Sequence, residues 1–342
     1  MEFQKPAEPQ RQGKFRRNEH LEGLLKEING LLRHVEDKVL HNFSMPKYPV
    51  LFIMGNPRCG TTVMMQWLAS TEKFCYPTNL LSRFYSAPYI GAKIQQLLMD
   101  KKYDFNNEIV DHNNKIDFTS DIGKTKGALS PNEFWYFWRR FFPYEEIQYL
   151  EEESLKKIDA RKFVAELAAI EAVFDKPFAL KGGIANLNIP FLSDVIDKAV
   201  FLYVKRHPFY NIQSILNARV KQLGSREVWY SFKPREYESL KNLDPIGQVT
   251  GQVYFINRYI EEGLGQIDSS RSLQVNYEDF CSSPKTVFGE IKGKMAKQGY
   301  RLDGDYAGPE KFESANKIRL SEDDIRKIAE SYRQFSGVNL IP

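Results

Sequence analysis

The residues with the clearest chemistry in this 342-residue chain lie between Gly55 and Thr62, in the order Gly-Asn-Pro-Arg-Cys-Gly-Thr-Thr. Gly55 and Gly60, with Pro57 between them, predict a tight turn. Apolar residues recur at helical spacing immediately afterwards, so the turn leads into the N-terminus of a helix. Such a terminus offers unpaired backbone N–H groups and the positive end of the helix dipole. With the Arg58 guanidinium and two hydroxyls added, the segment predicts an anion-binding site.

The position of the charge separates this loop from that of nucleotide hydrolases, which carry Lys directly after the second glycine. Here the charge lies inside the loop. The segment resembles the 5′-phosphosulfate loop of sulfotransferases, which reads Gly-x-Pro-Arg/Lys-Ser-Gly-Thr-Thr, and it departs at Cys59, where the family usually has Ser. The plain alternative is a Gly-Pro turn without a ligand. The resemblance implies that the cofactor 3′-phosphoadenosine 5′-phosphosulfate (PAPS; product PAP) is bound by Arg58, Cys59, Gly60, Thr61 and Thr62.

A second cation follows an apolar run, 199–204, that predicts a buried strand. Arg206 comes at the carboxyl end of that strand, where α/β proteins bind ligands, and Ser214 lies eight residues later on the next predicted helix. A guanidinium and a directed hydroxyl suit a second phosphate, although a surface salt bridge is the ordinary alternative. In sulfotransferases this pair holds the 3′-phosphate of the cofactor, and the resemblance extends over roughly residues 48–298.

In-line sulfuryl transfer also needs charge neutralisation on the leaving phosphate and a base for the acceptor proton. Cytosolic animal members carry Lys-Thr-His where this chain has Lys181-Gly182-Gly183, so the lysine is retained and the histidine is absent. We expect Arg58 and Lys181 to stabilise the leaving group. Glu133 is the first candidate for the base and His112 the second. The alternative role of Glu133 is that of a capping-box carboxylate paired with Ser130, and the alternative for His112 is a solvated histidine in a loop.

An acceptor pocket is predicted from five aromatic residues, Tyr85, Tyr89, Trp135, Tyr136 and Trp138. The alternative role of these aromatic side chains is ordinary packing in the core. Glu133, Asp117 and Asp121 would make the mouth of the pocket acidic. These features suit a small hydroxylated acceptor, such as a cationic or amphipathic natural product, with a glycan or glycolipid as the alternative.

A basic segment near the C-terminus contains Asn316, Lys317 and Arg319. We expect it to fold over the 3′ end of the cofactor, as the closing segment of family members does. The usual Arg-Lys-Gly signature is absent, and a solvated charge run is the alternative.

A nucleotide kinase or hydrolase is the main rival function. Its second signature is an apolar strand that ends in Asp for the metal, whereas the strands here end in Lys181 and in Lys205-Arg206. The sequence therefore favours a sulfotransferase that needs no metal. A noncatalytic nucleotide-binding module remains the third hypothesis.

These residues require a particular set of elements. Strands are predicted at 50–54, 176–181, 199–204 and 272–276, and helices at 18–40, 61–70, 130–142, 151–174, 188–196, 208–220, 246–263 and 284–298. Alternating strands and helices predict an α/β fold, a P-loop-like central parallel sheet flanked by helices. Residues 221–245 suggest a flap over the site.

Composition bounds the remaining expectations. Residues 1–17 predict a flexible basic tail, and the resemblance implies a single sulfotransferase domain over residues 18–342. A net charge of +4 does not indicate a nucleic-acid partner. Three scattered cysteines and the lack of a long apolar run favour a cytoplasmic enzyme without stable membrane insertion. The amphipathic helix at 18–40 either covers the core or mediates a homodimer.

Overall fold

A parallel four-stranded sheet forms the centre of the computed structural model, which describes residues 10–104, 118 and 120–342. Its strands lie in the order β2 (Ala179–Lys181), β1 (Val50–Met54), β3 (Ala199–Lys205) and β4 (Ser272–Asn276). In register, Phe52 of β1 lies opposite Leu180 and Phe201. All four carboxyl ends therefore meet at one edge, which is where Lys181 and Arg206 lie.

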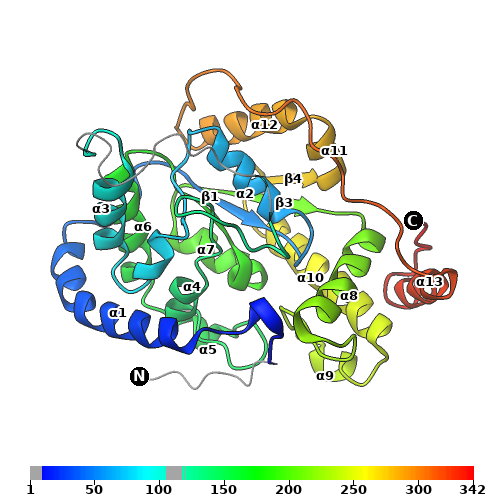
Figure 1. Cartoon of the computed structure of the whole chain (residues 1–342). Coiled ribbons are helices and arrows are strands. Elements are labelled where there is room, and N and C mark those ends of the chain that lie inside the picture. Colours follow the sequence, from blue (N-terminus) through cyan, green and yellow to red (C-terminus); the bar gives the residue numbers. More distant parts are fainter. Residues whose placement is uncertain (1–9, 105–117, 119) are drawn as a thin grey trace.

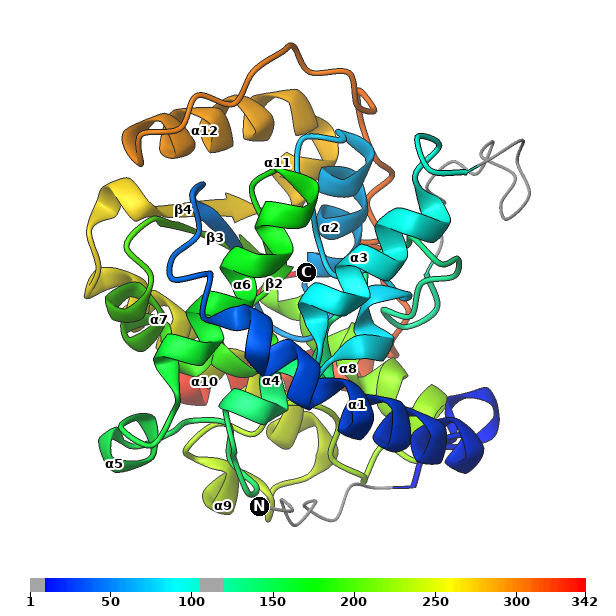
Figure 2. The same ribbon diagram turned by 90° about the vertical axis from the view of Figure 1, so that its left-hand side faces the viewer.

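Two apolar layers cover the sheet, because alternate residues of β1 face opposite sides. Leu51 and Ile53 pack against α2 (Thr61–Ser70), α11 (Tyr277–Ser282) and α12 (Pro284–Lys297). Phe52 and Met54 pack on the other side against α4 (Trp135–Phe141), α6 (Ala160–Phe174) and α7 (Ile189–Val195). Figures 1 and 2 show α11 and α12 on one side of the sheet and α4 and α7 on the other. The expected α/β fold is confirmed.

A third apolar cluster joins α8 (Pro208–Leu223), α10 (Pro245–Gly265) and α13 (Glu322–Ser336), which lies at the edge of the molecule (Figure 1). Ile212, Val249 and Ile328 are fully buried there. The shorter elements are η1 (Gly13–Phe15), η2 (Leu81–Phe84), α5 (Glu152–Leu155), η3 (Gly183–Leu187), α9 (Tyr237–Leu240) and η4 (Ser269–Arg271). Within the described ranges, no helix has both the length and the apolar composition of a membrane span.

Some predicted elements differ from the observed ones. The helix expected over 151–174 is two helices, because the carboxylate of Asp159 accepts a hydrogen bond from the Lys162 amide and starts α6 afresh. The described part of the predicted tail also contacts the domain. Gln12 donates its amide to the Gln222 carbonyl over 2.7 Å, and Lys14 pairs with Asp121.

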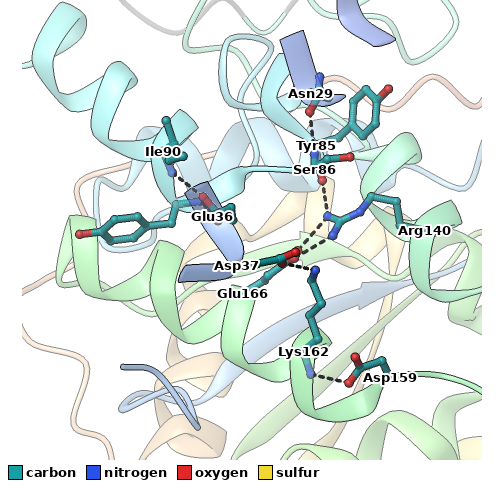
Figure 3. A network of polar contacts seen from close by, with 11 residues as sticks. Asn29, Glu36, Asp37, Tyr85, Ser86, Ile90, Arg140, Asp159, Lys162 and Glu166 are labelled. Atoms are coloured by element: carbon teal, nitrogen blue, oxygen red, sulfur yellow. Dashed lines mark hydrogen bonds and ion pairs between the residues drawn. The ribbon is translucent and has the colours of Figure 1, made fainter. Parts of the chain in front are cut away.

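Helix α1 (Glu19–Leu40) is fixed to the domain by buried polar side chains (Figure 3). Asn29 donates to the Arg83 carbonyl at 2.7 Å and accepts from the Ser86 amide at 2.7 Å. Glu36 is fully buried and accepts from the amides of Tyr89 and Ile90, at the start of α3 (Pro88–Met99).

A buried ion pair lies beside these contacts. Arg140 binds both oxygens of Glu166, at 2.7 and 2.9 Å, and also donates to the Tyr85 carbonyl (Figure 3). The inner face of α1 thus covers the core, whereas Leu24, Leu31 and Val35 on its outer face are exposed. The homodimer stays a prediction.

Glu36 gives a testable pH dependence. Burial is the main cause that raises its pKa from 4.5 to about 7, so the folded chain holds this proton more tightly than the unfolded chain does. The stability from this group is therefore present below pH 4.5 and lost as the pH rises through about 7. In urea titrations, wild type should lose up to about 3 kcal/mol relative to Glu36→Gln between pH 4.5 and 8.

The matched control is Glu27→Gln, on the exposed side of the same helix. Its difference from wild type should change far less over that range. Equal pH profiles for wild type and Glu36→Gln would contradict the assignment.

Candidate active site

The loop between β1 and α2 has a backbone that few sequences adopt. Gly55, Arg58 and Gly60 have φ of 154°, 67° and 107°. Gly60 precedes α2, and no side chain caps that helix start. A β-carbon at Gly60 would lie 2.4 Å from the ring of Tyr277, so only glycine fits there. The start of α2 therefore keeps the geometry of an anion site.

Cys59 does not contribute its side chain to that site. It is 1% exposed, and its sulfur lies beneath Gly55. Burial raises the pKa of the thiol to about 11, so it stays neutral. Cys59 therefore offers the loop its backbone and not its thiol, and its contact with the cofactor stays a prediction.

Arg206 and Ser214 lie against the loop although both follow it by about 150 residues. Arg206 donates from Nη1 to the Arg58 carbonyl at 3.0 Å and lies over the Tyr277 ring at 5.0 Å. Arg58 donates from Nε to the Ser214 hydroxyl at 3.4 Å. Burial, and to a smaller extent the charge of Arg58, lowers the pKa of Arg206. The two predicted anion-binding groups therefore form one continuous surface.

The C-terminal segment lies beside Arg206, and Asn316 makes the contact. Its side-chain oxygen accepts from Arg206 Nε at 2.9 Å, and its amide donates to Glu278 at 2.6 Å. The side-chain amide of Gln213 donates to the Lys317 carbonyl at 2.8 Å, and its oxygen accepts from the Arg319 backbone amide at 2.6 Å.

The side chain of Lys317 is largely exposed and pairs with Glu313. A cofactor contact through Lys317 or Arg319 stays a prediction. The cavity next to this segment has a volume of about 390 Å³ and is lined by Lys205, Arg206, His207, Pro208, Tyr210, Asn276, Glu278, Asp279 and Asn316.

Lys181 connects the loop to the candidate base. From the end of β2, its ammonium donates to Thr62 Oγ1 at 2.8 Å and to Glu133 Oε1 at 3.1 Å. The lysine side chain is 8% exposed and that of Glu133 56%. Desolvation acts to raise the pKa of Glu133, but the charge and hydrogen bond of Lys181 outweigh it and hold that pKa below its ordinary value. Glu133 is thus ionised at neutral pH.

The capped helix predicted at Ser130 is wrong. Helix α4 begins only at Trp135, after Phe134 with φ 54°, and the Ser130 hydroxyl donates to the Lys126 carbonyl instead. The reason is tertiary: the Asn132 amide donates to the Pro77 carbonyl at 2.7 Å and draws this segment into extended pairing. The capping-box alternative for Glu133 is thereby removed, and its carboxylate reaches Lys181.

The five predicted aromatic residues do not form one pocket. Trp138 is a core residue, 1% exposed, whose Nε1 donates to the Lys181 carbonyl at 3.0 Å and so positions that lysine. Tyr85 and Tyr136 form a pair with centroids 5.1 Å apart. Trp135 stacks on Phe232, which belongs to the segment predicted as a flap. Trp138 is therefore excluded as a pocket residue.

Tyr89 makes a different ring contact from the Tyr85–Tyr136 pair. It contacts Phe43 near the end of α1, with centroids 5.4 Å apart. Tyr230 was not among the predicted pocket residues, yet it lies in the electrostatic field of Arg58 and Glu133, and burial raises its pKa. Its place in the predicted flap, at 221–245, was the sequence signal.

The mouth near Glu133 is not acidic in the part of the chain that the structure describes. Glu133 is paired with Lys181, and Asp121 with Lys14, whose hydrogen bond holds the pKa of Asp121 below its ordinary value. Asp117 and His112 lie outside the described residues. The described residues contain no group of three His, Cys, Asp or Glu side chains that could hold a metal ion.

Comparison with known sequences gives a family. The profile of the Sulfotransferase family matches residues 49–292. Two curated relatives are both named omega-hydroxy-beta-dihydromenaquinone-9 sulfotransferase Stf3, from Mycobacterium bovis (strain ATCC BAA-935 / AF2122/97) and Mycobacterium tuberculosis (strain CDC 1551 / Oshkosh). Each is 23% identical over 248 residues, or 69% of this chain. The chain spans 60% of the length of these relatives.

Among solved structures, sulfotransferase STF9 from Mycobacterium avium is similar, with a TM-score of 0.52 and 13% identity. The match covers 98% of this chain and 88% of that one. At this identity the likeness concerns the fold, a central sheet flanked by helices.

The contact between Gly60 and Tyr277 predicts a steep cost for any side chain in the loop. Gly60→Ala should lower the free energy of unfolding by about 3 kcal/mol or more, since positive φ and overpacking both act. Gly299→Ala is the control, because Gly299 has φ 80° and no atom of the described residues lies within 4 Å of the β-carbon that it would gain. It should lose about 1 kcal/mol. Equal losses in urea titrations would show that Tyr277 does not confine the loop.

Proposed function

The chain belongs to the sulfotransferase family, and we propose that it transfers a sulfuryl group from PAPS to a hydroxyl of a small molecule. The observation that carries this proposal is the Lys181 ammonium, which lies 2.8 Å from Thr62 and 3.1 Å from Glu133. That contact joins the anion loop to a carboxylate, so charge neutralisation and proton removal are available at one place.

The residues present fit the proposed donor. The uncapped start of α2 and Arg58 suit the 5′-phosphosulfate. Because Gly60, which packs against Tyr277, has no side chain, the phosphate can approach the backbone closely. Arg206 and Ser214 suit the 3′-phosphate. Bound there, PAPS supplies a sulfuryl group on a good leaving phosphate.

In the proposed reaction the acceptor oxygen forms the new bond to sulfur as the bond from sulfur to the phosphate oxygen breaks. Glu133, already ionised, takes the hydroxyl proton. Arg58 and Lys181 neutralise the charge that develops on the departing PAP. Trp138 holds the carbonyl of Lys181 and thereby positions it. The proposal needs no metal ion, since these cations take its role.

A small hydroxylated acceptor remains the proposed substrate class. The Tyr85–Tyr136 pair and Tyr230 supply aromatic surface. The mycobacterial relatives are named for a hydroxylated menaquinone, which supports a hydroxyl as the accepting group. The paired carboxylates Glu133 and Asp121 remove the earlier reason to prefer a cationic molecule.

The function is tested by a turnover screen. Purified protein, PAPS and a panel of small alcohols, phenols, amines, glycans and glycolipids are followed by mass spectrometry. We expect one sulfuryl group to be added to a small alcohol or phenol, with or without a chelator. Turnover on glycans alone would overturn the acceptor class, and PAP binding without any turnover would indicate a noncatalytic module.

Donor recognition predicts a preference for the 3′-phosphate. Calorimetry should show tighter binding of PAP than of adenosine 5′-phosphate. Ser214→Ala should weaken PAP about fivefold, which corresponds to one hydrogen bond of about 1 kcal/mol. Binding of adenosine 5′-phosphate should not change. The exposed Ser282→Ala serves as control. Comparable affinity of wild type for both nucleotides would remove Arg206 and Ser214 from the donor site.

The proposed base makes a kinetic prediction. Glu133→Gln should lower kcat by about 100-fold or more, because amides do not accept the proton. Glu152→Gln, a surface partner of Lys156, should not change it. Because the pKa of Glu133 lies below its ordinary 4.5, the acidic limb of the wild-type kcat/KM profile should fall below pH 4.5. Near wild-type turnover of Glu133→Gln would move the role to His112 or another group.

A further inference from the structure

A tight hairpin covers the point at which the reactive groups meet. The amides and carbonyls of Asp121 and Lys124 exchange hydrogen bonds of 2.9 and 3.0 Å. The two residues between them, Ile122 and Gly123, have φ of 49° and 83°. Both values belong to a type I′ turn. A β-branched residue such as Ile122 rarely adopts that conformation, so surrounding contacts must hold the hairpin in place.

Those contacts come from both sides of the turn. Asp121 pairs with Lys14 of the N-terminal segment. Thr125 donates its hydroxyl to the Pro131 carbonyl at 2.7 Å, and Pro131 lies two residues before Glu133. Before the turn, the ring of Phe118 contacts that of Phe312, with centroids 5.4 Å apart. The tip is therefore positioned from several directions.

The tip itself borders reactive groups of two segments, the anion-binding segment between Gly55 and Thr62 and the segment that carries Glu133. A β-carbon at Gly123 would lie 3.5 Å from Thr62 Oγ1, 3.7 Å from Arg58 Nη1 and 3.8 Å from Glu133 Oε1. These are ordinary contact distances, so a methyl group would fit among them. It would then occupy the space in which Thr62 and Arg58 can donate to a ligand oxygen.

We propose that Gly123 is a specificity-determining residue, whose bare backbone forms the wall of the sulfuryl position. The inference rests on the proposed function, because it places the sulfuryl group between Arg58, Thr62 and Glu133. Without a side chain at residue 123, the space beside Thr62 Oγ1, Arg58 Nη1 and Glu133 Oε1 stays open to a sulfuryl oxygen. A side chain there excludes the sulfuryl group but leaves both phosphate positions of the donor open.

The test compares PAP with PAPS, which differ only by the sulfuryl group. Both are titrated by calorimetry without acceptor, and turnover is measured separately. Gly123→Ala should bind PAP within about twofold of wild type, bind PAPS about tenfold more weakly, and lose about 100-fold in kcat. The ratio of the two dissociation constants is the readout that general destabilisation would not move.

Gly127→Ala is the matched control. Gly127 lies in the same segment with φ 99°, and among the described residues its β-carbon would meet only the hydroxyl of Ser130, at 3.2 Å. Gly127→Ala therefore has an unfavourable positive φ, as Gly123→Ala does. It should leave the ratio of the PAP and PAPS dissociation constants unchanged. An unchanged ratio in Gly123→Ala, or equal loss of both nucleotides, would overturn the inference alone. Failure of wild type to bind either nucleotide would instead overturn the proposed function and this inference with it.

Discussion

The buried ammonium of Lys181 is the interaction on which the candidate site depends. It joins Thr62 at the start of α2, Glu133 before α4 and the carboxyl end of β2. A charge with 8% exposure needs partners, since an unpaired buried ammonium is very unfavourable. The need of Lys181 for a partner holds Glu133 next to the loop. In return, the charge of Lys181 keeps the Glu133 carboxylate ionised.

The other cations of the site lie close to one another. Arg206 donates to the Arg58 carbonyl, and burial, with a smaller effect from the charge of Arg58, lowers the pKa of Arg206. Such crowding is unfavourable until an anion enters, and two bound phosphates would relieve it. The neutral Cys59 thiol beneath the loop supplies no compensating charge. This charge pattern supports the proposed donor, which carries two phosphates.

Local patterns allowed much of this fold to be predicted. The short apolar runs became β1, β3 and β4, and the glycine-rich turn between β1 and α2 lies where expected. The spacing of Arg206 and Ser214 could also be recognised, because it depends on one strand and one helix. Both residues contact Arg58.

The remaining features depend on contacts between distant segments, which one sequence does not reveal. The capping pattern at Ser130 was overridden by pairing with residues 77–79, and that change released Glu133. An aromatic residue such as Trp138 is typical of a binding pocket. Here it lies in the core, where its indole N–H donates to the Lys181 carbonyl. Gly123 and Tyr230 belong to loops whose positions are set by Lys14 and Gln252.

A crystal structure of the protein grown with PAP is the most direct test of the claim that the loop and Arg206 form one donor site. The 5′-phosphate is expected over the amides of Gly60, Thr61 and Thr62, with the 3′-phosphate against Arg206 and Ser214. A nucleotide bound elsewhere, or bound in the reverse direction with its 5′-phosphate on Arg206, would contradict the proposed sulfuryl transfer at Lys181 and Glu133.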